Sequence, residues 1–482
     1  MIRHSVLILI LFLILSGCSD WLELKPIDDL VQDEFWQTKE DVKAVLMGAY
    51  AKFASIDDDL FIYGEIRGDM IEPERATNRQ EDLMTENILP TNRYCRWDDF
   101  YEVINYCNYV IEFADIVKER DPTFTTFQME GYKSEATFLR SLSYFYLVRI
   151  FKEVPFVTQS SQTDNQDFFL EKSADTTVLR LIKEDLVDAK IYATENYPEY
   201  TDNWGRATKS AFNALLADIS LWQFEYNDCV LYCDEILNSS KYVLVHGSQW
   251  YSIYFPGNSL ESIMEFQFDQ GLGQENEMYE LTIEDERFKA SIYAQDLLGV
   301  AEQIRKDGSY RPTDFLIWKY AGTQPDALTG RSSAELRNAN WILYRLADVM
   351  LMKAEAQNQL GDEDQAMELV NTIRQRAFMP PLTKPGSSTD IEDLILEERA
   401  RELAFEGKRY FDLVRMGRRN NYARKNAFIE RIIQNVNPSQ RFVLSTKLTD
   451  PYGWYLPIHI DELEANINLE QNPFYESFTD FE

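Results

Sequence analysis

The sequence predicts a mostly α-helical protein, in which about four helix pairs form a repeat scaffold and a long irregular part carries few short strands. Three observations favour this fold class. Apolar residues recur at helical spacing, two segments each divide into two helices around a short turn, and alternating strand patterns are rare. The hydrophobic content of 45% is ample for a packed core.

The N-terminus is typical of an exported protein. Residues 5–15 are almost wholly apolar and follow Arg3, but they are too few to span a bilayer as a helix, which takes about 20 residues. Leu15-Ser16-Gly17-Cys18 resembles a bacterial lipobox, in which the cysteine is joined to lipid and the chain is cut before it. We therefore expect a lipoprotein signal peptide at 1–17 and lipid attachment at Cys18. A plain signal peptide with a chance cysteine is the alternative.

One long amphipathic helix is expected near the middle of the first half. In residues 134–151, Leu139, Leu142, Tyr146 and Ile150 follow at spacings of 3, 4 and 4, which places them on one face of a helix. The predicted helix begins near Ser134 and ends before Pro155.

Two segments, 208–238 and 347–377, each predict a pair of helices joined by a turn, near Glu225–Asn227 in the first and around Leu360-Gly361-Asp362 in the second. Both segments resemble tetratricopeptide units. Two fainter pairs are predicted in 97–151 and 177–224. A single pair cannot bury its own apolar face, so at least three stacked repeats are expected. The repeat helices should cover about 40–56, 97–240 and 341–415.

Two long stretches interrupt this scaffold, at about 57–96 and 269–338. They show no sustained period and are rich in Asp, Glu, Asn, Gly and Arg. Long insertions on a rigid scaffold are usually functional. A short strand is predicted at 261–268, and no linker divides the chain, so we expect one domain over 18–482.

The composition excludes several partners and cofactors. The formal net charge of −33 repels nucleic acid and anionic membrane surfaces. No dinucleotide or P-loop motif occurs, and no cofactor or metal is predicted, although a bound calcium ion remains open. The remaining cysteines are expected to be buried free thiols at positions 95, 107, 229 and 233.

One charged helix raises the question of catalysis. Glu398, Glu402 and Glu406 share a helical stripe, where two of them would suit a glycosidase acid and base. The alternative is a structural ion network, because Arg399, Arg409 and nearby arginines counter the repulsion between like charges. We favour the structural interpretation. Neither His246 nor His459 adjoins a nucleophile motif.

Nine stretches follow one another over nearly the whole mature chain: "CSDWLE" at 18–23, "EDVKAVLMGAY" at 40–50, "WDDFYEVINYCNYVIE" at 97–112, "EATFLRSLSYFYLVRIFKEVPFV" at 135–157, "GRATKSAFNALLADISLW" at 205–222, "WILYRLADVMLMKAEAQNQLGD" at 341–362, "VNTIRQRA" at 370–377, "ILEERARELAFEGKRYFDLVRMG" at 395–417 and "LPIHIDELEANINLEQNPFY" at 456–475. Together they resemble the SusD/RagB family of outer-membrane nutrient-binding lipoproteins of Bacteroidota. The resemblance implies a tetratricopeptide-like scaffold beside an irregular ligand-binding part, and no catalysis. It also implies a lipid-anchored protein on the cell outer membrane, which captures a polymer fragment for import through a partner SusC-like, TonB-dependent transporter.

A sugar site needs an aromatic surface and hydrogen-bonding side chains. We expect these among residues of the two insertions, namely Tyr63, Arg67, Asp69, Glu72, Arg75, Asn78, Arg79, Tyr94, Tyr279, Arg287, Tyr293, Tyr310 and Trp318. Trp97 is assigned to packing. Arginines and carboxylates are mixed in 67–96, so ligand charge is not predicted. A peptide ligand, a helical glycoside hydrolase and a protein-binding scaffold remain as alternatives to glycan binding.

Overall fold

The computed structural model describes residues 35–162, 169–321, 331–434 and 436–478. The predicted signal peptide and Cys18 therefore lie outside the described residues. No helix within the described ranges has the length and apolar character needed to cross a membrane.

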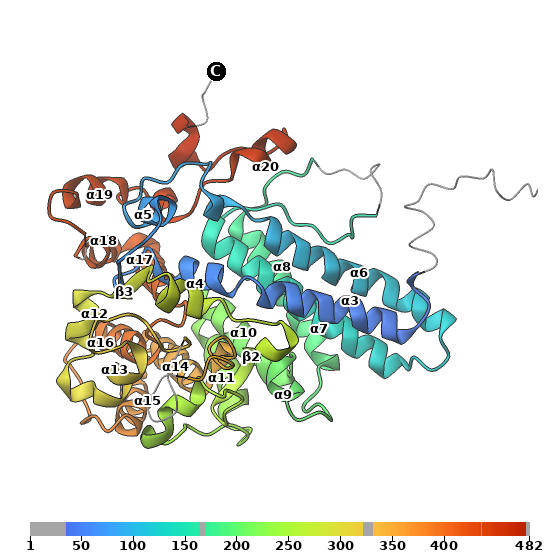
Figure 1. The fold of residues 1–482 in the computed structure, drawn as a ribbon, viewed down its shortest axis with the longest axis horizontal. Helices are drawn as coiled ribbons and strands as arrows, with labels where there is room; N and C mark the ends of the chain where they lie inside the picture. The colour runs from blue at the N-terminus through green and yellow to red at the C-terminus, as the bar shows by residue number, and fades with distance from the viewer. Residues whose placement is uncertain (1–34, 163–168, 322–330, 435, 479–482) are drawn as a thin grey trace, which may run out of the picture.

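The elements follow the chain in this order (Figure 1): α3 (Lys39–Ala54), α4 (Asp57–Glu65), β1 (Ile71–Pro73), α5 (Asn78–Met84), η2 (Arg93–Cys95), α6 (Asp98–Arg120), α7 (Thr126–Phe151), α8 (Asp175–Ala189), η3 (Lys190–Tyr192), α9 (Asp202–Gly205), α10 (Lys209–Trp222), α11 (Tyr226–Leu237), η4 (Gly247–Ile253), β2 (Ser262–Phe266), η5 (Gln270–Leu272), η6 (Glu280–Glu284), β3 (Phe288–Ala290), α12 (Ile292–Leu297), η7 (Val300–Glu302), α13 (Gln303–Ser309), β4 (Trp341–Arg345), α14 (Leu346–Leu360), α15 (Glu363–Arg376), α16 (Ser388–Glu402), α17 (Arg409–Tyr422), α18 (Lys425–Ile433), α19 (Arg441–Lys447), η8 (Pro451–Trp454), α20 (Ile460–Ala465) and η9 (Pro473–Phe478).

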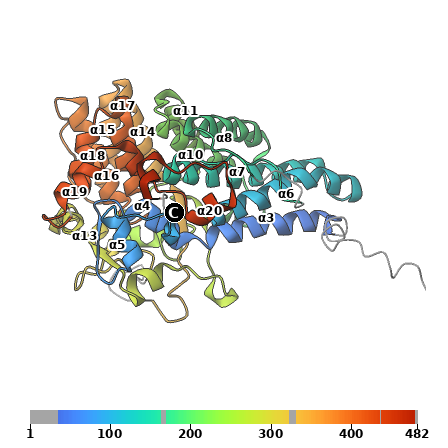
Figure 2. The ribbon, with the colours of Figure 1, turned by 90° about the horizontal axis from the view of Figure 1, so that it is seen from above.

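The scaffold consists of stacked helix pairs, as predicted. Within the described chain, α3 packs against α6, α7 against α8, α10 against α11, and α14 against α15, and α6 packs on α7 while α11 packs on α14. In Figure 2 these pairs follow one another from α3 and α6 on the right to α14 and α15 on the left. The helices α5 and α13 of the two insertions lie below this row in the view. The mostly helical, repeat-based fold class is therefore confirmed.

The helix predicted at 134–151 is longer than expected. It begins at Thr126, because Thr125 and Gln128 form a capping box. The apolar period failed to show this start, since Met129 is the one buried residue among 126–133. By contrast, the predicted turn after Leu360 is present. There Gly361 has a φ of +88°, which a glycine adopts without strain.

Two small antiparallel sheets connect distant segments. β1 pairs with β3, and β2 pairs with β4, so the strand predicted at 261–268 is confirmed as Ser262–Phe266. Residues 341–345 were expected to begin a repeat helix and instead form β4. Each side chain of this strand is buried, as suits aromatic and branched residues in a covered strand. The first insertion also holds more helix than expected, since α4 begins at Asp57.

A buried ion cluster joins the repeat helices to the second insertion. Its carboxylates are Glu261, Glu302, Glu398, Glu402 and Glu406, and its cations are Arg305, Lys319, Arg345, Arg374 and Arg376. All ten residues are buried. Burial alone would raise the pKa of the Glu402 carboxyl, but the Arg376 and Arg345 guanidinium groups outweigh burial and hold that pKa well below its usual range. The three glutamates are therefore structural, but they do not share one helical stripe as predicted, because α16 ends at Glu402 and Glu406 lies in the turn that follows.

Candidate functional site

A cleft of about 520 Å³ lies where the two insertions meet. We call it the insertion cleft. It is lined by Asp58, Thr77, Asn78, Arg79, Gln80, Arg93 and Tyr94 from the first insertion, and by Glu277, Glu280, Leu281, Asp285 and Arg287 from the second. The structure thus brings together four of the predicted site residues, Asn78, Arg79, Tyr94 and Arg287.

The pairing of β1 with β3 creates this meeting point. Glu72 lies opposite Lys289 in the antiparallel register, and the backbone N–H of Arg75 continues the ladder by donating to the Glu286 carbonyl at 3.0 Å. Further along, the backbone N–H of Glu277 donates to the buried Asp57 carboxylate at 3.2 Å. Residues some 200 positions apart are held at fixed distance by these bonds, so the cleft has firm walls.

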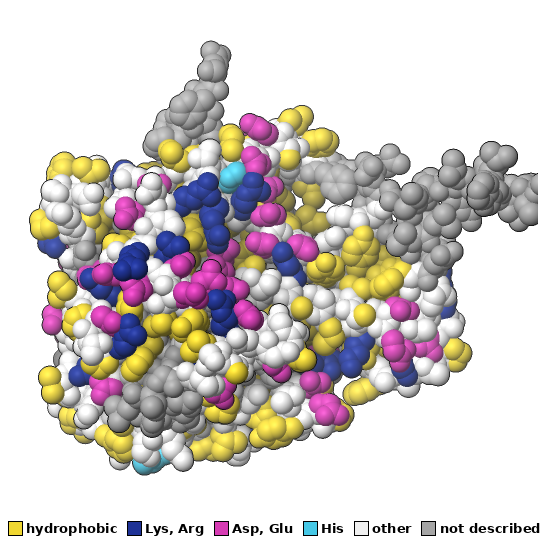
Figure 3. All heavy atoms as spheres, viewed as in Figure 1, with side chains coloured by type: hydrophobic (Ala, Val, Ile, Leu, Met, Phe, Trp, Pro, Cys, Tyr) yellow, Lys and Arg dark blue, Asp and Glu magenta, His cyan; other side chains and the backbone are white. Residues whose placement is uncertain are grey.

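The cleft offers both donors and acceptors of hydrogen bonds. Asn78 and Arg79 open helix α5, where their side chains are exposed and have no partner among the described residues. Carboxylates face them across the cleft. Burial and the neighbouring Glu280 raise the pKa of Glu277, while Arg287 is bonded to Asp285 at 2.6 Å. On the face shown in Figure 3, positive and negative side chains are interspersed rather than gathered by sign.

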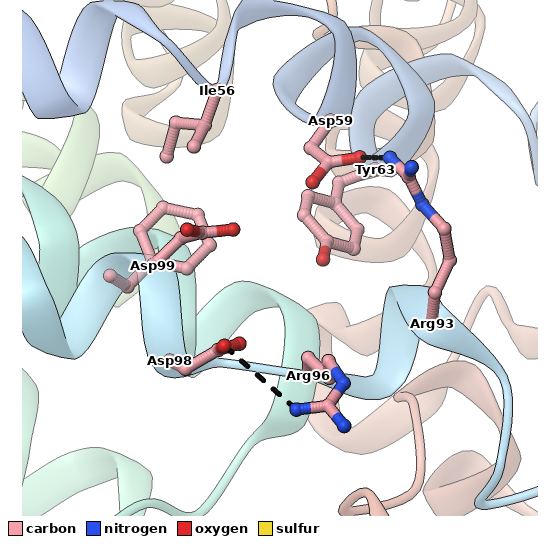
Figure 4. A pocket seen from close by; sticks show the side chains of 8 residues that line it. Ile56, Asp59, Tyr63, Arg93, Arg96, Asp98 and Asp99 are labelled. Atoms are coloured by element: carbon pink, nitrogen blue, oxygen red, sulfur yellow. Dashed lines mark hydrogen bonds and ion pairs between the residues drawn. The ribbon is translucent and has the colours of Figure 1, made fainter.

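Arg93 separates the cleft from a second, smaller pocket. Its guanidinium lies 2.7 Å from Asp59 Oδ1 and 4.6 Å from the centre of the Tyr94 ring, so it covers a face of that ring. The pocket behind it measures about 220 Å³ (Figure 4). In Figure 4 the Asp59–Arg93 pair lies at one side of this pocket and the Arg96–Asp98 pair at another. Burial and the nearby Asp58 carboxylate raise the pKa of Asp59 to about 7, against the pull of Arg93.

Some predicted residues belong to the interior and are corrected here. Asp69 is buried and accepts two hydrogen bonds from Arg409, at 2.6 and 2.7 Å. Arg67 is buried against Glu86 and donates to the carbonyls of Gly453 and Trp454. Arg409, far along the chain, neutralises Asp69, and Glu86 neutralises Arg67, so neither side chain is available to a ligand.

Aromatic candidates were also overestimated. Tyr310 is a core residue with 3% exposure, and Tyr63 is buried beside the smaller pocket, where its hydroxyl donates to the Tyr94 carbonyl. The Tyr293 hydroxyl accepts from Arg431 at 2.7 Å, and the Trp318 indole N–H donates to the Asp307 carbonyl at 2.9 Å. None of these four rings lines the insertion cleft.

Three further candidates are partly exposed but do not line the cleft. Tyr279 lies in sequence between the lining residues Glu277 and Glu280. Glu72 lies opposite Lys289 in the β1–β3 pair, and Arg75 forms an ion pair with Glu286 at 3.1 Å. The sequence reasoning missed several lining residues: Asp58, Thr77, Gln80, Arg93, Glu277, Glu280, Leu281 and Asp285. The signal available for all of them was their position inside the two insertions.

Comparisons with known proteins support one family. A model described as the SusD family matches residues 220–475, and one described as "Starch-binding associating with outer membrane" matches residues 20–221. SusD-like protein P38 of Formosa agariphila is 29% identical, and the alignment covers 86% of this chain and 91% of that protein. A SusD-like protein of Bacteroides ovatus is 25% identical, and the alignment covers 83% of this chain and 80% of that protein.

Solved structures share the fold. A SusD superfamily protein from Bacteroides vulgatus superposes with a TM-score of 0.76 at 20% identity, covering 91% of this chain and 100% of its own. A protein described as a laminarin-binding SusD-like protein superposes with a TM-score of 0.69 at 21% identity. The superposition covers 91% of this chain and 99% of that protein. Because the SusD family model alone spans more than half of the 482 residues, this chain belongs to the SusD family.

Proposed function

We propose that this protein binds a glycan in the insertion cleft at the cell surface, without cleaving it, for import through a SusC-like, TonB-dependent transporter. One observation carries the choice of site. The cleft combines side-chain donors that have no partner in the described chain, Asn78 and Arg79, with carboxylate acceptors from the opposite insertion. A sugar hydroxyl both donates and accepts, so this mixture suits a ring of hydroxyl groups.

Two facts about relatives agree with a carbohydrate ligand. One matching family model is described as starch-binding, and one structural neighbour is described as laminarin-binding. The glycosidase alternative loses its candidate residues, because Glu398, Glu402 and Glu406 are buried within the ion cluster. Glu398 and Glu402 lie on α16 and Glu406 lies in the turn after it, so a polymer cannot reach them without disrupting this segment.

The test uses the full-length protein in detergent on an array of plant, algal, fungal, bacterial and host polysaccharides. We expect at least one polymer to bind, and Arg79→Ala and Asn78→Ala to weaken it by about tenfold each, a factor equal to about 1.4 kcal/mol. Arg180→Ala is the matched control, because Arg180 is exposed on α8, away from the cleft. Binding of peptides but of no glycan would contradict the ligand class, and release of shortened products would contradict the absence of catalysis.

Anchoring and delivery need separate tests. We infer that Cys18 carries the lipid and that the protein lies on the outer membrane beside its transporter. Cys18→Ser should release the protein from the membrane fraction and abolish labelling by a fatty-acid analogue. Retention of the label would place the lipid elsewhere. Affinity purification of the tagged protein should recover a TonB-dependent barrel, and its absence after crosslinking would contradict the partnership.

A further inference from the structure

We propose that the protein has a second saccharide-binding site, in a pocket beside α9. This inference rests on the proposed function in one respect, since it assumes that the ligand is a polymer able to reach both sites. The α9 pocket measures about 240 Å³, and its lining includes Asn196, Tyr200, Trp204, Lys241, Tyr242 and Leu260. It shares no lining residue with the insertion cleft.

Tyr200 provides an aromatic surface that already faces solvent. The side chain is 70% exposed, whereas the neighbouring Trp204 is buried. The two ring centres are 4.6 Å apart with the rings at 69°, so the edge-to-face contact supports one side of Tyr200 and leaves the rest open. The Trp204 indole N–H donates to the Ser259 carbonyl at 2.9 Å, which fixes the supporting ring.

The loop that carries Tyr200 is held in place by Asn203. The Asn203 side chain accepts from the Tyr197 backbone N–H at 2.8 Å and donates to the Tyr200 carbonyl at 3.1 Å. Holding the ring before the ligand arrives lowers the entropy lost on binding. A large exposed aromatic on a constrained loop is therefore suited to stack on the apolar C–H face of a pyranose.

Polar groups at the rim complete the recognition. Asn196 is exposed, and its amide has no partner among the described residues, so it can both donate to and accept from sugar hydroxyls. Lys241 Nζ lies 3.0 Å from Glu195 Oε2 at the same rim, which adds a donor and an acceptor. Leu260, 61% exposed, extends the apolar part of the wall.

The shape favours a sugar over a protein surface. A stable protein interface buries about 800 Å² on each partner and is broadly flat or complementary over that area. The α9 pocket is instead a small hollow of about 240 Å³, with an aromatic ring, an amide and an ion pair around it. In Figure 1, α9 lies at the bottom of the molecule and α5 near the top, so two sites on one polymer would raise affinity through effective concentration.

The test counts bound oligosaccharides by native mass spectrometry on the full-length protein. The probe is a short oligosaccharide cut from the polymer that binds best on the polysaccharide array. We expect two oligosaccharides on the wild-type protein, one on Tyr200→Ala and one on Arg79→Ala. Affinity for the whole polymer should fall by about tenfold or more in Tyr200→Ala, because the gain from bivalency is lost.

Control variants separate binding from folding. Tyr200→Phe keeps the ring and should retain two oligosaccharides, and Tyr192→Ala removes another tyrosine, 47% exposed, that does not line the pocket. If Tyr200→Ala melts early, Asn196→Ala replaces it as the test, because this side chain makes no contact that the fold needs.

Each outcome has a definite meaning. A single oligosaccharide that is lost in Arg79→Ala and kept in Tyr200→Ala overturns the second site and leaves the insertion cleft intact. A single oligosaccharide with the opposite pattern overturns the cleft and supports the α9 pocket. If no polymer on the array binds, both sites are overturned. If Tyr200→Ala keeps both oligosaccharides and loses only its binding to the transporter, the α9 pocket contacts protein instead of sugar.

Discussion

Replacing Arg345 by Met should destabilise the whole molecule, because Arg345 is the most connected cation of the buried ion cluster. Its side chain is 0% exposed. It donates to Glu261 at 2.6 Å, to the Glu402 carboxylate and carbonyl at 2.7 Å each, and to both oxygens of Glu406 at 2.8 and 3.0 Å. Met fills a similar length of space but offers none of these donors.

The magnitude follows from what is left behind. The three buried carboxylates that Arg345 contacts would share three cations in place of four, and their desolvation would no longer be compensated. Removing one partner of a buried ion pair typically costs about 3–5 kcal/mol. Summing five charge-assisted hydrogen bonds at about 1.5–3 kcal/mol each would exceed that, but contributions within one network are not additive. We therefore expect a loss of about 3–5 kcal/mol in the free energy of unfolding.

The assay is urea unfolding of the full-length protein at pH 7 and 25 °C, followed by tryptophan fluorescence and circular dichroism. Arg180→Met is the matched control. The Arg180–Glu184 pair on α8 is more than half exposed, and such a pair contributes at most about 1 kcal/mol. A loss below about 1 kcal/mol for Arg345→Met would refute the reasoning, since it would show that water or relaxation satisfies the stranded carboxylates.

Two further predictions concern packing and pH. Gly64→Ala should destabilise the protein by about 1–3 kcal/mol, because a Cβ at this position overlaps the Gly407 carbonyl. In the control Gly131→Ala, on α7, the added Cβ meets open space, so this variant should be neutral or stabilising by about 0.5–1 kcal/mol. Thermal melting distinguishes the two variants, and equal effects would contradict the packing at Gly64. Since burial raises the pKa of Asp59 to about 7, the folded state binds this proton more tightly than the unfolded chain between about pH 4 and 7, and its contribution to stability falls as pH rises through that interval. The melting temperature of Asp59→Asn should therefore vary less with pH over this range than that of the wild-type protein. Parallel curves of melting temperature against pH would exclude Asp59 as the group responsible.

The location of the cleft could be predicted from the sequence, but most of its residues could not. Two aperiodic, polar insertions on a periodic scaffold indicated where to look. Within them, Tyr310 and Asp69 resembled ligand-binding residues by type, yet one is core and the other pairs with Arg409. Composition cannot separate an exposed tyrosine from a buried one, and it cannot show that a carboxylate has a distant partner.

Local patterns determined much of this protein by themselves. Apolar spacing, turn residues and the ordered family stretches predicted the helix pairs, the turn at Gly361 and the family, because helices and tight turns depend on neighbours a few positions away. Only the tertiary structure decided how the insertions meet. The β1–β3 register, the ion cluster around Arg345 and the walls of the insertion cleft join residues as much as 220 positions apart. Such contacts arise from the packing of the whole chain, so no local pattern encodes them.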